Sequence, residues 1–364
     1  MKLKITIFAL IFLPLAVYAQ YPDFSYAQYD NFLKRMKSIP NLIFLTQYEF
    51  SKTYDSTKII VSLRHDVDVA IISAQKMAEI EAQNGVHSTY YILHTASYYH
   101  PQNDFEDHNN TVLEQIKKIH GLGHEIGIHN DLITLQVVYN IDPIDFLHKE
   151  LQWLRDNGIP IYGSASHGSS YCKHYGYLNY YFWRECSKKN YNPHFPNVDT
   201  VIKDDGTVVV LDKADFSDFG LSYESYCTNY NLYYADCHRD KYGNKFNPTK
   251  IDISKWKPGD RIIILTHPIH WRNYNTNQTL YVYPNPAANE FNIIVQDAHD
   301  SEITVDFYTP KGQKVYTTTI EMHDGKQKLE IPNFLKNGLY FLRAYYTKEN
   351  KTESYRGKLV IYRQ

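Results

Sequence analysis

Four short strand-like runs in this chain carry aspartate or histidine at their carboxyl ends. They span residues 62–68, 124–129 and 161–167, and 263–268, where His267 precedes Pro268. Folds with parallel strands place their chemistry at the carboxyl ends of those strands, so we expect these end residues to gather at one edge of a sheet. Carboxylates and imidazoles gathered in this way predict a metal-dependent hydrolytic site.

The sharpest of these signals is the step Asp66-Val67-Asp68. Successive strand side chains alternate between faces, so Asp66 and Asp68 point the same way. Two carboxylates on one face repel each other, which raises the pKa of one of them unless a cation lies between them. Aspartate is also common at strand ends for turn capping alone. The histidines that end the other runs favour the metal interpretation.

The predicted elements divide the chain into an α/β part and an all-β part. Helices are expected at 32–37, 71–84, 111–120 and 143–157, with a further strand at 86–93. This alternation with the strands above predicts a parallel sheet or barrel. After residue 272 only strands are expected, at 290–295, 302–308, 314–320, 328–331, 338–346 and 357–362. Turn residues separate these strands, which is typical of a small β-sandwich.

The amino terminus has the pattern of a secretory signal peptide. Lys2 and Lys4 precede an apolar stretch at residues 5–17, and Ala19 ends a small-residue cleavage site. No later apolar stretch is long enough for a transmembrane segment. The net charge of −2, without a basic run interleaved with aromatic residues, excludes nucleic acid as an expected partner. The predicted organisation is a signal peptide at 1–19, an α/β domain at 20–272, a linker at 273–279 and a β domain at 280–364.

Four cysteines lie in the second half of the α/β domain: Cys172, Cys186, Cys227 and Cys237. In an oxidising compartment an even number predicts two disulfides, and three connectivities are open.

Three motifs carry a resemblance to a known family. Arg64-His65-Asp66-Val67-Asp68, Gly123-His124-Glu125-Ile126-Gly127-Ile128-His129 and Thr266-His267-Pro268-Ile269-His270-Trp271 resemble, in this order, the polysaccharide deacetylase (NodB-homology) superfamily. The likeness is to the branch whose first motif reads His-Asp-Val-Asp, and it covers about residues 58–271. It implies a deformed (β/α) barrel, a divalent metal that is usually Zn²⁺, and a hydrolase that removes N- or O-acetyl groups from a polysaccharide or oligosaccharide.

The resemblance also implies roles for four residues. Asp66 matches the general base and Asp68 the first metal ligand of the family. His129 matches the first metal histidine, and His267 matches the histidine that protonates the leaving group.

The chain departs from the family pattern at one metal ligand. The second metal histidine of the family falls on Ile133, which cannot bind a metal. His167 ends the next strand and is the candidate replacement, and a surface turn histidine is its alternative role. His124 lies five positions before His129, and this odd spacing predicts that the two lie on opposite faces of the strand. A degenerate site on a non-catalytic glycan-binding or adhesive protein is therefore a second hypothesis.

The C-terminal part resembles another family. Tyr283-Pro284-Asn285-Pro286-Ala287, Asn337-Gly338-Leu339-Tyr340 and Lys358-Leu359-Val360-Ile361 are similar to the type A sorting domain of the type IX secretion system. An immunoglobulin-like carbohydrate-binding module has a similar strand pattern and is the alternative. The sorting resemblance implies an immunoglobulin-like sandwich, handling by the type IX secretion machinery, and a secreted or cell-surface protein from which this domain is removed.

Overall fold

The computed structural model describes residues 24–69, 71–100, 104–187, 190–238, 246–272, 278–295, 301–323, 326–348 and 351–363. The expected signal peptide at 1–19 and most of the expected linker lie outside these residues.

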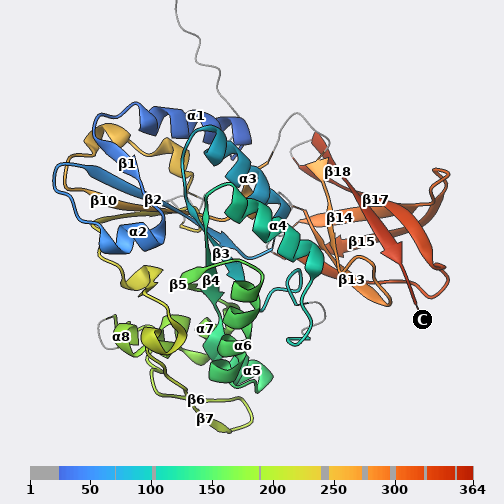
Figure 1. Cartoon of the computed structure of the whole chain (residues 1–364). Helices are drawn as coiled ribbons and strands as arrows, with labels where there is room; N and C mark the ends of the chain where they lie inside the picture. The colour runs from blue at the N-terminus through green and yellow to red at the C-terminus, as the bar shows by residue number, and fades with distance from the viewer. Residues whose placement is uncertain are drawn as a thin grey trace, which may run out of the picture.

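The first part of the chain is mixed α/β (Figure 1). Its helices are α1 (Tyr26–Lys37), α2 (Gln47–Lys52), α3 (Ile71–Gln83), α4 (Asn110–Gly121), α5 (Leu132–Tyr139), α6 (Pro143–Asp156), α7 (Ser170–Tyr175) and α8 (Arg184–Ser187). Its strands are β1 (Leu42–Phe44), β2 (Ile59–Val67), β3 (Thr89–Leu93), β4 (Glu125–Asn130), β5 (Ile161–Ser166), β6 (Thr200–Ile202), β7 (Val208–Val210), β8 (Tyr223–Glu224), β9 (Leu232–Ala235) and β10 (Arg261–Thr266).

A curled parallel sheet forms the centre of this part. Its strand order is β8-β5-β4-β3-β2-β10-β9, with β1 paired to the start of β2. All nine residues of β2 are buried, as expected for a strand that is covered on both faces. Val61, Leu63 and Val67 pack into the main hydrophobic core, whereas Ile60 belongs to a separate cluster on the other face. This alternation turns Arg64 and Asp66 away from the main core and into the concave side of the sheet.

Three of the expected helices, α3, α4 and α6, form close to their predicted bounds, and the ends of α4 and α6 carry capping signals. The helix expected at 32–37 was predicted too short, because α1 begins at Tyr26 after its cap Ser25. Asp142 accepts hydrogen bonds from the backbone amides of Ile144 and Asp145, and Pro143 occupies the first turn of α6. Asn109 caps α4 in the same way. The helix α5 was not predicted, because its sequence is apolar on all sides and has no helical periodicity.

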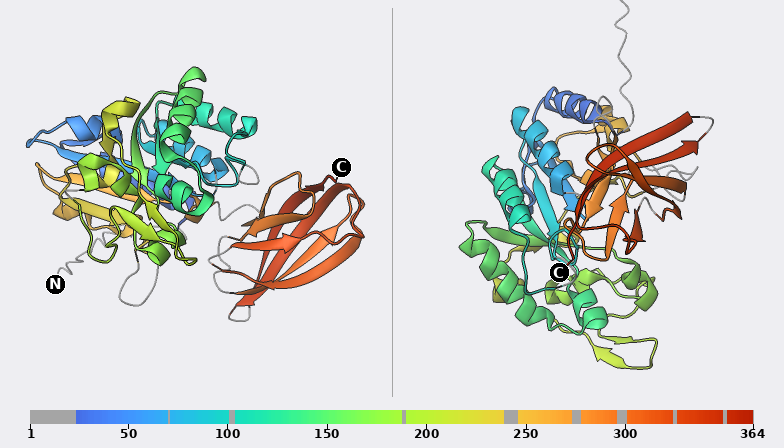
Figure 2. Two further views of the ribbon diagram at one scale, coloured as in Figure 1. Left: turned by 90° about the horizontal axis from the view of Figure 1, so that it is seen from below. Right: turned by 90° about the vertical axis from the view of Figure 1, so that its right-hand side faces the viewer.

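The second part of the chain consists of β-sheets. Its strands are β11 (Gln278–Thr279), β12 (Tyr281–Tyr283), β13 (Glu290–Ile294), β14 (Glu302–Tyr308), β15 (Lys314–Glu321), β16 (Lys326–Glu330), β17 (Gly338–Lys348) and β18 (Lys351–Ile361). One sheet has the order β11-β18-β17-β14-β15 and the other the order β12-β13-β16. They enclose a core of their own, which includes Phe291, Phe307 and Leu359. Figure 2 shows this sandwich beside the α/β part, and the hydroxyls of Ser73 and Tyr281 join the two at 3.0 Å.

The prediction of two disulfides is wrong for the described residues. Cys186 and Cys227 form a disulfide, while Cys172 and Cys237 are free. Cys172 is buried in α7, which follows β5, and Cys237 follows β9. Four strands lie between β5 and β9 in the order of the sheet, so the two thiols belong to different regions of its edge.

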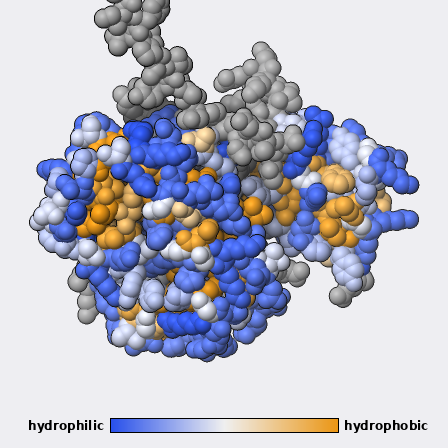
Figure 3. All heavy atoms as spheres, turned by 45° about the horizontal axis from the view of Figure 1, so that its top comes forward, coloured by the Kyte–Doolittle hydropathy of each residue, from blue (hydrophilic) through white to orange (hydrophobic). Residues whose placement is uncertain are grey.

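The face of the molecule in Figure 3 is mostly hydrophilic, with smaller hydrophobic areas on both parts. Among the described residues, no helix combines the length and the apolar character needed to cross a bilayer.

Candidate metal centre

Asp66 is held at the end of β2 by a buried arginine. The Arg64 guanidinium donates from Nε to Asp66 Oδ1 at 2.8 Å and from Nη2 to Asp66 Oδ2 at 2.7 Å. Burial opposes ionisation of Asp66, but the charges of Arg64 and His129 outweigh it and lower the pKa of the carboxyl group. Asp66 is therefore ionised at neutral pH, and each oxygen keeps a lone pair for a further donor.

Three side chains from the carboxyl ends of β2, β4 and β5 converge beside Asp66. His129 Nε2 lies 3.2 Å from Asp68 Oδ1, and His167 Nδ1 lies 3.2 Å from His129 Nε2 and 3.8 Å from Asp68 Oδ1. These donor atoms lie within 4.8 Å of one another. Ligands at about 2.0–2.1 Å from a tetrahedral zinc ion are separated by roughly 3.4 Å, so the three atoms have suitable spacing for one ion.

The surroundings of these residues also fit a divalent metal. Asp68 Oδ1 is buried and accepts no hydrogen bond within the described part of the chain. The Nδ1 atom of His129 lies 2.7 Å from the carbonyl oxygen of Ala165, and donation to it leaves the lone pair of Nε2 directed at Asp68. Burial lowers the pKa of His129, but Asp66 and Asp68 raise it above its ordinary value. The two carboxylates therefore make this position attractive to a cation.

Ile133 and His124 do not take part in this arrangement. Ile133 is buried in α5 and packs into the main hydrophobic core. His124 lies on the helix-covered side of the sheet, where its Nδ1 contacts Ser88 and its Nε2 lies 3.0 Å from the carbonyl oxygen of Ala78. His167 therefore occupies the position beside Asp68 and His129 that His124 does not reach.

His267 approaches from the opposite side of Asp68. Its Nε2 lies 3.8 Å from Asp68 Oδ2, and its Nδ1 lies 2.5 Å from Asp236 Oδ1. Asp236 also accepts the backbone amide of His267 at 2.8 Å and contacts His270 Nδ1 at 2.9 Å. Burial lowers the pKa of His267, but Asp236 and Asp68 outweigh it and raise the pKa to about 9. The ring is therefore cationic at neutral pH and can give a proton from Nε2.

Two of the supporting carboxylates had weak signals in the sequence. Asp236 follows a short aromatic run and is a strand-end acid like Asp68, but its pairing with His267 is a tertiary contact. Glu81 lies in α3 four residues after Met77, so it falls on the buried face of that helix. Glu81 Oε1 lies 2.7 Å from His65 Nε2. The other ring nitrogen, His65 Nδ1, lies 2.7 Å from the hydroxyl of Thr266 on β10. A glutamate on an apolar helix face is the signal that could have identified it.

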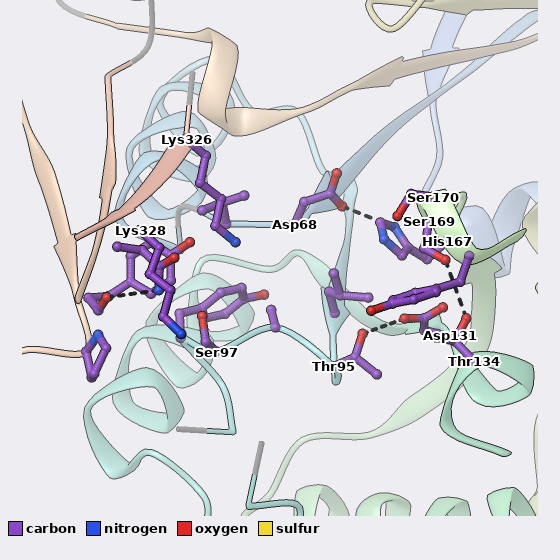
Figure 4. Close-up of a pocket in the computed structure, with 18 of the residues that line it drawn as sticks. Asp68, Thr95, Ser97, Asp131, Thr134, His167, Ser169, Ser170, Lys326 and Lys328 are labelled. Atoms are coloured by element: carbon purple, nitrogen blue, oxygen red, sulfur yellow. Dashed lines mark hydrogen bonds and ion pairs between the residues drawn. The ribbon is translucent and has the colours of Figure 1, made fainter. Parts of the chain in front are cut away.

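A cavity of about 1060 Å³ extends from Asp68 and His167 toward the C-terminal sandwich. Asp68, His167 and the segment 95–98 line it on the α/β side, and Lys326 and Lys328 of β16 line it on the other (Figure 4). Pockets of roughly 300–1,000 Å³ typically hold drug-sized ligands. The sandwich thus forms one wall of the cleft into which the candidate site opens.

Comparisons with known proteins identify the C-terminal part. A family model described as "Secretion system C-terminal sorting domain" matches residues 281–362. The expected sorting domain is therefore confirmed, and it implies export to the cell surface or beyond. A comparison with characterised proteins found no match.

Solved structures match at low similarity. Latent PorU from Porphyromonas gingivalis is 16% identical over 23% of this chain and 9% of that one, with a TM-score of 0.20. A β-glucuronidase from Parabacteroides merdae is 16% identical over 23% of this chain and 13% of that one, with a TM-score of 0.17. A family 4 carbohydrate esterase from Bacillus anthracis is 14% identical over 68% of this chain and 81% of that one, with a TM-score of 0.27. The chain spans only about a tenth of the first two structures, and similarities of this size do not establish a common fold.

Proposed function

We propose that this chain is an exported, metal-dependent carbohydrate deacetylase of the polysaccharide deacetylase (NodB) type. The observation that carries the proposal is the convergence of Asp68, His129 and His167 between Asp66 on one side and His267 on the other. The sorting domain at 281–362 supports a substrate outside the cell.

Asp66 and His267 divide the proton transfers of acyl hydrolysis between them. Asp66 is the general base, because it is ionised and lies beside the proposed metal ligands, 3.5 Å from His129 Nε2. His267 is the general acid for the departing amine or alkoxide, because it is cationic at neutral pH and its Nε2 is directed at the same centre. Asp236 orients the acid through His267 Nδ1.

Asp68, His129 and His167 would hold a divalent ion, most suitably Zn²⁺, since two imidazoles and one carboxylate form a common catalytic zinc set. Bound there, the ion would supply Lewis-acid polarisation of the acetyl carbonyl and lower the pKa of a water molecule. The chain's own residues keep Asp66 charged, turn His129 toward the centre and leave access from the cavity.

The test is acetate release from a panel of acetylated glycans, combined with metal analysis of the purified protein. Asp66→Asn should retain the metal and lose roughly 10²–10⁴-fold in rate, because the base contributes about that much. Asp68→Asn should lose the metal, because it removes a charged ligand. The comparison of the two separates loss of chemistry from loss of the centre.

Unchanged turnover in Asp66→Asn would refute the mechanism. Glycan binding without acetate release from any member of the panel would favour the non-catalytic alternative. The panel would also decide between N-acetyl and O-acetyl groups, which the residues of the centre do not distinguish.

A further inference from the structure

A second group of histidine and carboxylate side chains, separate from the candidate centre, comes from the β3–α4 connection and the helix α6. Figure 1 shows where these two segments run in the chain. We propose that His100, His108 and Glu150 form a second site for a divalent transition metal of the zinc class. Nothing in the proposed deacetylase reaction requires this group.

The spacing of the donor atoms matches that of the first centre. Glu150 Oε2 lies 2.9 Å from His108 Nε2 and 3.5 Å from His100 Nε2. The two imidazole rings have centroids 4.7 Å apart, and the donor atoms of all three residues lie within 4.8 Å of one another. Separations near roughly 3.4 Å are those of ligands that share one tetrahedral ion.

The donors are held in place by contacts that metal ligands commonly have. The Nδ1 atom of His100 lies 2.8 Å from the carbonyl oxygen of Asp107, and donation to that carbonyl leaves Nε2 with a lone pair. The ring of His108 stacks on Trp153 at 3.8 Å between centroids. The Tyr99 hydroxyl donates to Glu150 Oε1, which leaves Oε2 for the two histidines.

His100 provides an independent observation that points to a cation. Its side chain is fully buried, and Nε2 has no hydrogen-bond partner in the described part of the chain although it faces a carboxylate. Glu150 Oε2 lies closer to His108 Nε2, at 2.9 Å, than to His100 Nε2, at 3.5 Å, so a hydrogen bond within the first pair leaves the second nitrogen without a partner. One ion bound by the three atoms satisfies all of them at once.

The site has access to solvent for a fourth ligand. A cavity of about 300 Å³ adjoins His108 and Glu150, and Asp104, Glu106 and Asp145 also line it. Lys149 lies in the same lining and pairs with Glu106 at 3.5 Å and Asp145 at 3.0 Å. Carboxylates still outnumber this single cation, so the entrance keeps an excess of negative charge, which favours the approach of cations.

The proposed role of this ion is to fasten a long connection. His100 and His108 belong to the segment between β3 and α4, and Glu150 belongs to α6. The same segment carries residues 95–98, which line the large cavity beside Asp68. The ion would therefore hold one wall of the candidate active site without contact to the reacting atoms.

The test is zinc stoichiometry of the purified full chain after metal removal and reloading. We expect two equivalents for the unmodified chain and one for His100→Ala/His108→Ala. His174→Ala is the matched control, because His174 also pairs with a carboxylate, Asp204 at 2.9 Å, but is exposed. This control should keep both equivalents. Equal zinc content in the double variant and the unmodified chain would overturn the proposal.

A second measurement keeps the test valid if the double variant folds poorly. In a His129→Ala background, Zn²⁺ at about 100 times its dissociation constant should raise the melting temperature of the α/β domain by roughly 5 °C. Adding His108→Ala, at the rim of the cavity, should abolish that increase. An equal increase with and without His108 would show that the ion binds elsewhere, and absence of any increase with His108 present would also refute the site.

Discussion

Replacement of Glu81 by glutamine should destabilise the α/β domain by about 3 kcal/mol at neutral pH. The buried carboxylate of Glu81 lies 2.7 Å from the Nε2 atom of His65. It also accepts hydrogen bonds from the hydroxyls of Ser88 at 2.6 Å and Tyr90 at 2.7 Å, and from the Tyr29 hydroxyl. Burial opposes the charge, but His65 and the other donors lower the pKa of Glu81 from 4.5 to about 2. A difference of that size between folded and unfolded states corresponds to about 3 kcal/mol.

The sign of the pH dependence follows from this lowered pKa. Between about pH 2 and pH 4.5 the unfolded chain binds a proton at Glu81 and the folded chain does not, so the stability of the folded state rises with pH in this range. The contribution is complete above pH 4.5, falls to about half by pH 3 and is lost below about pH 2. Glutamine has no charge, so the difference between variant and unmodified protein should follow the same course.

The assay is urea unfolding at several pH values between 3 and 7, followed by tryptophan fluorescence. The four tryptophans lie at residues 153, 183, 256 and 271, so fluorescence reports on the α/β domain without the sandwich. Glu79→Gln is the matched control on the same helix. Glu79 pairs with Lys76 at the surface at 2.9 Å, so its replacement should cost less than about 1 kcal/mol.

A Glu81→Gln cost that is the same at pH 3 and pH 6 would refute the reasoning. Such a result would assign the cost to altered packing in place of the carboxylate charge.

Three further predictions concern the candidate centre and the export of the chain. His167→Ala should weaken zinc binding, measured by competition with a chelator, because it removes one of the three proposed ligands. His124→Ala should leave zinc affinity unchanged, because its ring faces the helix-covered side of the sheet. Asp236→Asn should keep the metal and lower acetate release by roughly 10- to 1000-fold, because His267 loses the charge that orients it and keeps it protonated; equal rates would exclude that role. Intact-mass measurement of secreted protein should show a chain of about 260 residues that lacks 1–19 and 280–364, and a C-terminal domain present on all secreted material would contradict this.

Local patterns predicted three helices of the α/β part well and one of its strands less well. The helices α3, α4 and α6 agree with the expected ranges within one or two residues, because capping residues and amphipathic periodicity are local signals. The strand prediction at 86–93 began too early, since β3 starts at Thr89. The prediction of two disulfides failed because pairing depends on which parts of the chain meet, and the spacing of cysteines does not contain that information.

The sequence by itself determined which residues could carry the chemistry. Alternation along one strand places Asp66 and Asp68 on the same face, and the strand-end positions of His129, His167 and His267 predict a common edge. The match at 281–362 likewise follows from short motifs that are contiguous in the chain.

The tertiary structure decided how those residues are paired. The parallel order of β5, β4, β3, β2 and β10 determines which strand ends are neighbours, and it places His167 beside His129 while Ile133 turns into the core. The partnership of His267 with Asp236 and the gathering of His100, His108 and Glu150 likewise join segments distant in sequence. Such contacts form only when burial of the sheet's two faces brings the strands and helices together, and no local pattern specifies them.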